Sequence, residues 1–108
     1  MGIWGILIRG AKERNIPFLI TREEALALFV QQDRKCALTG LKLKLNRDSN
    51  EPYSATTASL DRIDSSKGYT IDNVQWVHKV INIMKNDHSQ SEFVDWCRKV
   101  VNFAGIKI

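Results

Sequence analysis

Cysteine is scarce in this chain of 108 residues, which contains only Cys36 and Cys97. Two cysteines are too few for a disulfide framework, so a reducing, cytoplasmic location is the simpler prediction. The sequence also lacks any apolar run near the ~20 residues that a membrane-spanning helix needs, so no membrane partner is expected. Its first residues, MGIWGILIRGAKER, are only briefly apolar and contain no small-residue cleavage site, which argues against a signal peptide.

What is present is the composition of one globular domain. Apolar residues make up 44% of the chain and charged residues 26%, which argues against a disordered chain. A length of 108 residues suffices for a single modest core but not for two, and no repeat or low-complexity tract divides it. The net charge of +4 and the pI near 9.3 favour a polyanionic partner such as nucleic acid, but charge alone does not decide, because many basic proteins bind nothing acidic.

Residues 1–45 are predicted to form two helices and a first strand. The first helix covers residues 3–15, with Ile6, Leu7 and Ala11 inward, and the proline of the following IPFLI segment argues against its continuation. IPFLI itself is predicted to be a short extended piece.

A second helix is predicted to begin at a capping box, Thr21 to Glu24, and to run to about Arg34. CALTG then forms a tight turn. LKLKL, residues 41–45, alternates apolar and basic residues with the period of a half-buried strand.

A polar loop follows over residues 46–56, and the chain ends with a last helix over residues 89–104. Ser89 and Glu92 can form the capping box of this helix, and Gly105 stops it. Its predicted apolar face consists of Phe93, Cys97, Val100, Val101 and Ala104.

The central stretch, residues 56–87 (TTASLDRIDSSKGYTIDNVQWVHKVINIMKND), is rich in polar side chains that can bind ligands. TASLDRID alternates, so it is predicted to be a strand with Ala58, Leu60 and Arg62 on one face and Asp61 on the other. SSKGY is predicted to be a turn whose glycine is free to take a positive φ. TIDNVQWV is predicted to be a second short strand or a loop.

A helix is predicted over VHKVINIMKN, with Val77, Ile81 and Met84 buried. At 3.6 residues per turn, three of its polar residues fall within one narrow stripe: His78, Asn82 and Lys85. A strand carboxylate facing helix amides makes a pocket for one hard divalent cation, which takes oxygen ligands and keeps several waters.

Each of these residues also has an ordinary structural explanation when taken alone. An Asp-Arg pair on a strand is more often a surface ion pair than a metal site, and an Asp-Asn pair is more often a turn or a helix cap. A helical asparagine is usually just exposed. The joint spacing, rather than any single residue, favours a ligand site.

The run CALTG, SLDRIDSSKGY, NVQWVHK and IN.MK resembles the HNH endonucleases of the ββα-metal superfamily, particularly small phage-type members. The resemblance extends over nearly the whole chain and is strongest over residues 56–86. It implies an α+β fold in which a ββα-metal core carries flanking N- and C-terminal helices, all in a single domain of residues 1–108. It further implies that Asp61 and Asn82 bind Mg²⁺, Mn²⁺ or another divalent cation, and that Asn73 braces the loop by hydrogen bonds.

The first histidine of the H-N-H pattern, the general base that activates water, is replaced here by Arg62. Guanidinium stays protonated near neutral pH, but it can clamp the scissile phosphate. Tyr69 and His78 remain as candidate bases, because some superfamily members with arginine at this place carry a nearby tyrosine and because His78 shares a helical face with Asn82. Tyr69 is equally well explained as a ring packed beside the turn. Lys85 lies where a phosphate-contacting or structural lysine often follows.

Structural zinc is not expected in this chain. Many HNH domains are held by two cysteine pairs around the motif, whereas here the first pair would be Cys36 and Thr39 and there is no second pair. Four-coordinate zinc needs more ligands than these. Cys36 and Cys97 are therefore predicted to be core thiols, with the terminal helices supplying the burial that zinc would otherwise provide.

These expectations combine into a metal-dependent DNA endonuclease that hydrolyses phosphodiester bonds, by nicking or by double-strand cleavage. The alternative is a catalytically impaired HNH-fold module that binds DNA, which the missing histidine favours. A structural or protein-binding module would explain the apolar faces but not the clustered ligands. Without a separate recognition module, stringent DNA specificity would require a homodimer or a partner protein. Phosphate contacts outside the site are expected from basic residues: Arg9, Lys12, Arg14, Lys42, Lys44 and Arg47.

Overall fold

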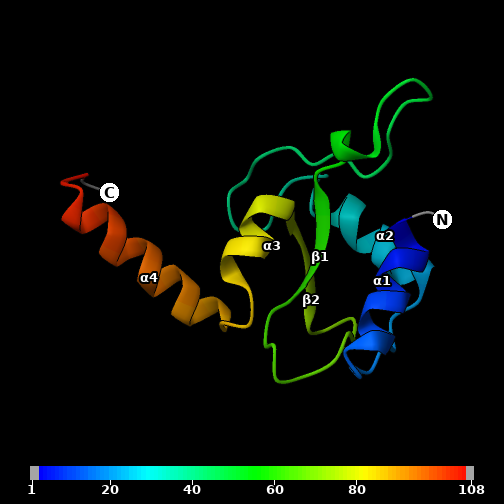
Figure 1. The fold of residues 1–108 in the computed structure, drawn as a ribbon, viewed down its shortest axis with the longest axis horizontal. Coiled ribbons are helices and arrows are strands. Elements are labelled where there is room, and N and C mark those ends of the chain that lie inside the picture. The colour runs from blue at the N-terminus through cyan, green and yellow to red at the C-terminus, as the bar shows by residue number, and fades with distance from the viewer. Residues whose placement is uncertain (1–2, 107–108) are drawn as a thin grey trace.

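The computed structural model describes residues 3–106, which form a small mixed α/β domain with four α-helices and a two-stranded antiparallel sheet (Figure 1). The elements in chain order are α1 (Ile3–Glu13), α2 (Arg22–Gln31), the short 3₁₀ helix η1 (Tyr53–Ala55), β1 (Ala58–Arg62), β2 (Val74–His78), α3 (Lys79–Lys85) and α4 (Gln90–Phe103). Among the helices of these residues, none has the length and apolar character that crossing a bilayer requires.

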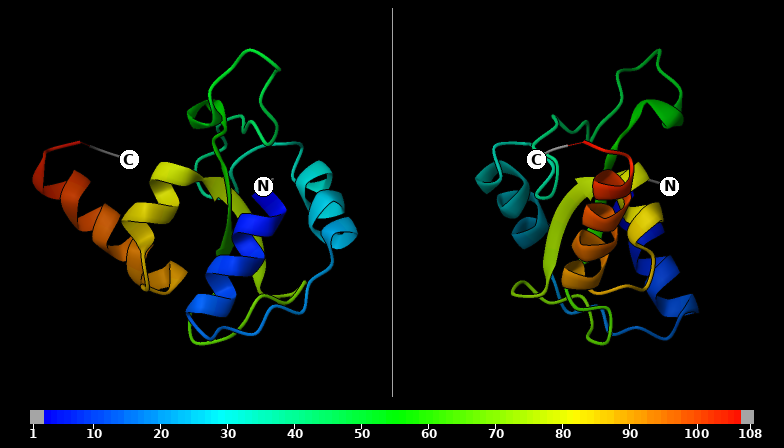
Figure 2. Two further views of the ribbon diagram at one scale, coloured as in Figure 1. Left: turned by 45° about the vertical axis from the view of Figure 1, so that its right-hand side comes forward. Right: turned by 90° about the vertical axis from the view of Figure 1, so that its left-hand side faces the viewer.

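The sheet and the helix that follows it form the centre of the fold. Strands β1 and β2 pair from Ala58 opposite His78 to Arg62 opposite Val74, and α3 begins at the very next residue. Figures 1 and 2 show α2 and α3 on opposite sides of the sheet, with α1 beside β1. The strand–strand–helix order predicted for the central stretch is therefore present, although Val77 belongs to β2 rather than to the helix.

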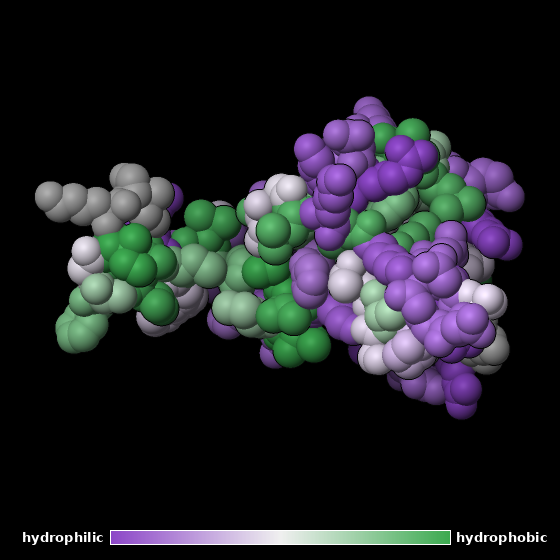
Figure 3. Space-filling view, turned by 90° about the horizontal axis from the view of Figure 1, so that it is seen from above, coloured by the Kyte–Doolittle hydropathy of each residue, from purple (hydrophilic) through white to green (hydrophobic). Residues whose placement is uncertain are grey.

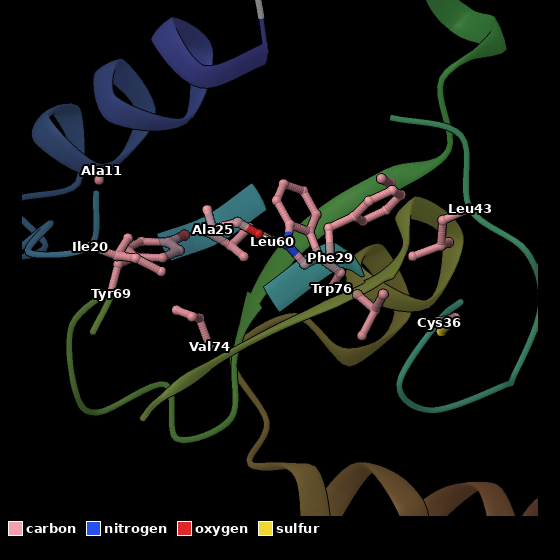
Figure 4. Packing of buried hydrophobic residues seen from close by; sticks show 12 residues of the cluster. Ala11, Ile20, Ala25, Phe29, Cys36, Leu43, Leu60, Tyr69, Val74 and Trp76 are labelled. Carbon is pink, nitrogen blue, oxygen red and sulfur yellow. Dashed lines mark hydrogen bonds between the residues drawn. The ribbon is translucent and has the colours of Figure 1, made fainter. Parts of the chain in front are cut away.

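Trp76 of β2 is the largest side chain of the core and is 1% exposed (Figure 4). Its ring meets Phe29 of α2 edge-on at 5.6 Å, and its indole Nε1 donates to the Ala25 carbonyl at 2.8 Å. The Gln32 side chain bonds both the amide and the carbonyl of Trp76, at 2.9 and 3.0 Å. These contacts fix α2 against β2, and the capping box predicted at Thr21 starts the helix.

Helix α1 packs through Trp4, Leu7 and Ala11, which are spaced three and four residues apart and so share one face. Trp4 stacks edge-on against Phe18 at 5.2 Å, and Phe18 lies 5.1 Å from Tyr69. The prediction that Ile6 points inward is wrong, because its side chain falls beside this face and is 42% exposed.

Residues 41–45 do not form the predicted strand, although the CALTG turn is present, closed by the Gly40 amide donating to the Cys36 carbonyl at 2.9 Å. The segment forms an isolated bridge between Lys35 and Lys42, and the Leu43 amide donates to the Arg34 carbonyl at 2.8 Å. Further on, the Lys44 amide donates to the Thr57 hydroxyl at 2.8 Å and the Lys44 carbonyl accepts the Thr57 amide at 2.8 Å, but this pairing does not extend into a strand ladder. Helix α2 also stops at Gln31, before the predicted end at Arg34, which has a positive φ of 58°.

Gly68 was expected to use a positive φ, and that expectation is wrong: among the described glycines outside helices, Gly40 and Gly105 have one. Gly68 is needed for close approach instead. A Cβ at this position would lie 2.7 Å from the Pro17 carbonyl oxygen, which accepts the Tyr69 amide at 2.8 Å. The turn is thus pressed against the segment that follows α1.

Helix α4 leaves the rest of the molecule and points away from it (Figures 1 and 2). Its predicted capping box at Ser89 and its stop at Gly105, with a φ of 80°, are both present. Phe93 is the buried residue of this helix, whereas the rest of the predicted apolar face lacks a core to pack on, and Val100 is 65% exposed. Met84 of α3 is likewise 57% exposed rather than buried. Cys36 is a buried free thiol as predicted, but Cys97 is only half-buried.

Candidate functional site

A cleft of about 250 Å³ lies between α1, β1, α3 and the loop after β1, and we refer to it as the β1–α3 cleft. It collects residues that are distant in sequence: Leu7, Arg14, Ser59, Leu60, Asp61, Arg62, Ser65, Tyr69, Asn82, Ile83, Asn86 and Asp87. Asp61, Arg62, Tyr69 and Asn82 are among the residues predicted from the sequence to form the site. Asn73, His78 and Lys85 are not among the lining residues.

Asp61 forms the floor of the cleft and is 4% exposed. Its Oδ2 accepts a hydrogen bond from Gln75 Nε2, the residue directly opposite on β2, at 3.0 Å. Its Oδ1 accepts one from Lys85 Nζ, also at 3.0 Å, and that ammonium donates as well to the Arg62 carbonyl at 2.8 Å. The carboxylate is therefore fixed in orientation from both sides before any ligand arrives.

Lys85 is fully buried, with an exposed fraction of 0%. The prediction that Lys85 contacts DNA phosphates is wrong for this structure, because the side chain turns inward from the last turn of α3 to Asp61. The alternative prediction, that Lys85 has a structural role, agrees with its contacts to Asp61 and to the Arg62 carbonyl. A helical periodicity alone could not separate the two roles, since both place Lys85 on the sheet-facing side of α3.

Asn82 reaches the cleft from the middle of α3. Its Nδ2 donates to the Ser59 hydroxyl at 2.6 Å, which ties the helix to β1. This bond uses the amide nitrogen, and the carbonyl oxygen is the atom of Asn82 that suits a hard cation. A carboxylate has about four lone-pair sites, so Asp61 can bind a cation in addition to its two donors.

Asp87 adds a second carboxylate to the lining of the cleft, and the sequence reasoning did not identify it. Its position in the sequence could have indicated it, because Asp87 directly follows Asn86, just beyond the C-terminal end of α3. Among residues 3–106, no three His, Cys, Asp or Glu side chains gather in a group that could hold a metal ion. The donor set of the cleft, two carboxylates (Asp61 and Asp87) and two amide oxygens (Asn82 and Asn86), fits a hard divalent cation that keeps several waters rather than a soft, protein-caged one.

Arg62 lines the cleft from the end of β1, but its guanidinium is engaged with the following loop. Nη1 donates to the carbonyls of Ser65 and Lys67, at 2.7 and 2.9 Å. The guanidinium carbon also lies 5.5 Å from the centre of the Tyr69 ring. Arg62 thus orders the loop and at the same time brings positive charge to the wall of the cleft.

The two candidate bases lie in different places. Tyr69 lines the cleft, is 4% exposed, and its hydroxyl accepts a hydrogen bond from Arg14 Nη2 at 3.0 Å. His78 caps α3 instead, with its Nδ1 accepting the Val80 amide at 3.1 Å. Because His78 lies opposite Ala58 in the sheet, three residues from Asp61, it stands about 10 Å along the strand from that carboxylate.

The prediction that His78 and Asn82 share one face of a helix is therefore wrong. His78 has an extended backbone, with φ −66° and ψ 139°, and belongs to the strand. The i, i+4 relation of a helix does not apply across that boundary. His78 therefore does not lie beside Asp61.

Asn73 braces the loop between the strands, as the resemblance implied. Its Oδ1 accepts the Asp64 amide at 2.9 Å, and its Nδ2 donates to the carbonyls of Asp64 and Gly68 at 3.0 and 2.9 Å. Hydrogen bonds from the Ser66 side chain and backbone lower the pKa of the Asp64 carboxyl. Asn73 holds the loop that carries Tyr69 and does not itself line the cleft.

The basic residues that were predicted to contact phosphates outside the site differ in how they are held. Lys44 forms an ion pair with Glu51 and lies 3.7 Å from Asp48, and the hydrogen bond to Glu51 raises the pKa of Lys44. Lys42 is exposed. The remaining contacts of this group are Arg9 with Glu13, Arg14 with Tyr69 and Arg47 with the Glu51 carbonyl. Arg14 is the member of the set that lines the cleft.

Comparisons of this chain with protein-family models, with curated proteins and with solved structures return no match.

Proposed function

We propose that this protein is a metal-dependent DNA endonuclease of the HNH type, and that the β1–α3 cleft is its active site. The observation that carries the proposal is the convergence of four elements on one cleft. Asp61 comes from β1, Asn82 from α3, Tyr69 from the connecting loop and Arg14 from the end of α1. Oxygen ligands for a divalent cation thus lie beside two guanidinium groups that suit a phosphodiester.

Asp61 and Asn82 are the proposed metal ligands, with Asp87 as a further oxygen donor. A divalent cation held there would polarise the scissile phosphate and neutralise charge on the leaving oxygen. Gln75 and Lys85 keep the Asp61 carboxylate in one orientation. That rigidity favours catalysis, because ligands that need no rearrangement lose no free energy to reorganisation.

Arg62 and Arg14 are proposed to contact the phosphate from the side of the loop. Guanidinium groups form charge-assisted hydrogen bonds to phosphate oxygens, and such bonds stabilise the charge that develops as water attacks. Tyr69 is the proposed general base, since it lines the cleft, and it would take the water proton as the phenolate, after its own hydroxyl proton has passed to solvent. His78 is not proposed for that role because it caps α3.

A second function is favoured by the Asp61–Lys85 ion pair. A carboxylate neutralised by a buried ammonium attracts a cation less strongly than an unpaired one. Together with an arginine where the superfamily has its base, this supports a DNA-binding module that does not cleave. The two proposals share the cleft and the phosphate contacts and differ only in the chemistry.

An assay for nicking of supercoiled plasmid distinguishes the endonuclease from the DNA-binding module that does not cleave. With Mg²⁺ or Mn²⁺ the full chain is expected to nick DNA, and EDTA is expected to abolish nicking. Asp61→Asn, which keeps an oxygen for Lys85, and Asn82→Ala should each lower the rate by more than the roughly 10–100-fold that loss of an indirect metal contact costs. Asp72→Asn is the matched control, because it removes an exposed loop carboxylate that does not line the cleft.

Activity that survives EDTA, or that falls equally in Asp72→Asn, would contradict the endonuclease proposal at this cleft. DNA binding without cleavage in either metal would support the non-cleaving module instead.

A further inference from the structure

Helix α4 presents an apolar face that the rest of the described chain does not cover. Figure 3 shows hydrophobic residues along the arm that α4 forms beyond α3. Trp96 is 55% exposed, Val100 65% and Phe103 96%, and Met84 at the end of α3 is 57% exposed. A shallow groove of about 400 Å³ runs along this face, lined by Met84, Phe93, Trp96, Cys97, Val100 and Val101 among others.

The spacing of these residues matches that of a helix that packs on another helix. Phe93, Trp96, Val100 and Phe103 follow one another at intervals of three, four and three residues, which is the stripe of an antiparallel or parallel helix pair. A single helix of 14 residues is marginal in water by itself, so an uncovered stripe of this kind gains most of its stability from a partner.

The charged residues beside the stripe indicate which partner α4 pairs with and whether the two helices run parallel or antiparallel. Glu92 and Lys99 lie seven residues, or about two turns, apart and so share one flank of the stripe. Their side chains are 61% and 58% exposed, although Glu92 lies near His88 and Lys99 near Asp95. In an antiparallel pair, Glu92 of each copy meets Lys99 of the other, whereas a parallel pair would bring like charges together.

We propose that α4 is the dimerisation helix of this protein and pairs antiparallel with α4 of a second copy of the chain. The interface is isologous, with its two-fold axis near the middle of the helix. Cys97 lies close to that axis, so the two Cys97 thiols come near each other. This proposal rests on α4 and the end of α3 and is independent of any activity in the β1–α3 cleft.

Sedimentation equilibrium of the full chain is expected to show a monomer–dimer equilibrium. Val100→Asp puts a charge into the stripe and should raise the dissociation constant at least about a hundredfold. Asn102→Asp adds the same charge two residues on, at the opposite side of the helix, and should leave the dissociation constant unchanged. Both variants should keep the melting temperature of the domain at low concentration, because neither residue belongs to the core.

Charge reversal tests the direction of pairing. Glu92→Lys and Lys99→Glu should each weaken self-association about tenfold, since each creates two like-charge contacts per dimer. An equimolar mixture of the two single variants should associate more tightly than either variant alone, because the mixed antiparallel dimer regains opposite charges at both contacts, although Glu92→Lys also removes the carboxylate of the α4 capping box.

Crosslinking with a short bismaleimide gives a second readout in the native state. It should join two chains through Cys97, and Cys97→Ser should abolish the product, because Cys36 is only 3% exposed. A chain that stays monomeric at every concentration, or a dimer that Val100→Asp leaves intact, would overturn the proposal. A monomer that binds anionic vesicles and loses this binding in Val100→Asp would overturn it too, and would assign the face to a lipid surface.

Discussion

Asp61, which lines the cleft, and Lys85 form a buried ion pair, with exposed fractions of 4% and 0%. Burying both charges has a desolvation cost, which good geometry and additional hydrogen bonds offset. Gln75 and the Arg62 carbonyl supply those bonds. The pair therefore holds β1 and α3 together and also sets the orientation of the proposed metal ligand.

Lys85→Met is expected to lower the free energy of unfolding by about 3–5 kcal/mol, because it leaves the Asp61 carboxylate buried without a charge partner. Urea denaturation measures this loss. Adding Asp61→Asn to Lys85→Met should recover part of the stability, and Lys12→Met, at an exposed position of α1, is the control. Equal stability of Lys85→Met and Lys12→Met would show that the ion pair is not formed in solution.

Tyr69→Phe is expected to slow metal-dependent nicking by ~10²–10⁴-fold, the usual value of a general base. The substitution removes the hydroxyl that lies in the cleft and keeps the ring that packs on Phe18. His78→Ala should change the nicking rate by less than about threefold, since its imidazole caps α3. The reverse order of effects would mean that His78, not Tyr69, takes the proton.

At the scale of elements, α2 and α4 begin with the same kind of cap but differ in what they pack against. Thr21 and Ser89 each complete a capping box. Helix α2 buries Ala25 and Phe29 against β2, whereas Phe93 is the buried residue of α4. A cap stabilises the whole fold only when its helix is part of the cooperative core.

Thr21→Ala is expected to lower the global free energy of unfolding by about 1 kcal/mol. Ser89→Ala should leave the global value unchanged and instead speed amide hydrogen exchange within α4, because that helix is joined to the body only near its first turn, by buried Phe93 and by the Gln75 Nε2 hydrogen bond to Gln90 Oε1. Thermal unfolding and exchange measured on both variants, at a concentration that keeps the chain monomeric, test this contrast. A fall in global stability with Ser89→Ala would show that α4 packs on the body of the protein.

The elements that local signals specify were predictable from the sequence. The capping boxes at Thr21 and Ser89, the stop at Gly105 and the alternation of β1 all depend on neighbours within a few residues. Residues 41–45 show the same alternation, yet they form one isolated bridge, with Lys35, and a few backbone bonds to Arg34 and Thr57 instead of a ladder. A strand needs a partner that a one-dimensional pattern does not supply.

The candidate site shows the same limit. Asp61 and Asn82 could be placed together because β1, β2 and α3 follow one another as a short strand–strand–helix run. The inward turn of Lys85 and the arrival of Arg14 from α1 depend on contacts across 24 and 55 residues, with Asp61 and Tyr69 respectively. Gly68 is explained by Pro17, a contact that the turn sequence alone does not contain.

At the scale of the whole molecule, the net charge of +4 would attract the phosphates of the proposed DNA partner. Arg14 and Arg62 bring part of this charge to the cleft, whereas Lys85 is neutralised by Asp61 and Lys44 by Glu51. Phosphate contacts release condensed counterions, so their number is measurable without a structure of the complex.

The affinity for duplex DNA is expected to fall with salt, with a log–log slope that grows by ~0.9 for each phosphate contacted. Arg14→Gln should reduce the slope by about one contact, whereas Lys85→Met should leave it unchanged because that ammonium is buried. Fluorescence anisotropy across a salt series measures both slopes. An affinity that does not respond to salt would contradict DNA as the partner.

The central claim is that Asp61 and Asn82 together hold the ion used for cleavage, and anomalous diffraction from crystals soaked in Mn²⁺ tests it most directly. The account predicts an anomalous peak inside the β1–α3 cleft, within bonding distance of an Asp61 oxygen and the Asn82 carbonyl oxygen, and no such peak in Asn82→Ala crystals. Two results would contradict this claim. One is manganese bound only elsewhere on the molecule. The other is a cleft without manganese in which the Lys85 ammonium remains paired with the Asp61 carboxylate.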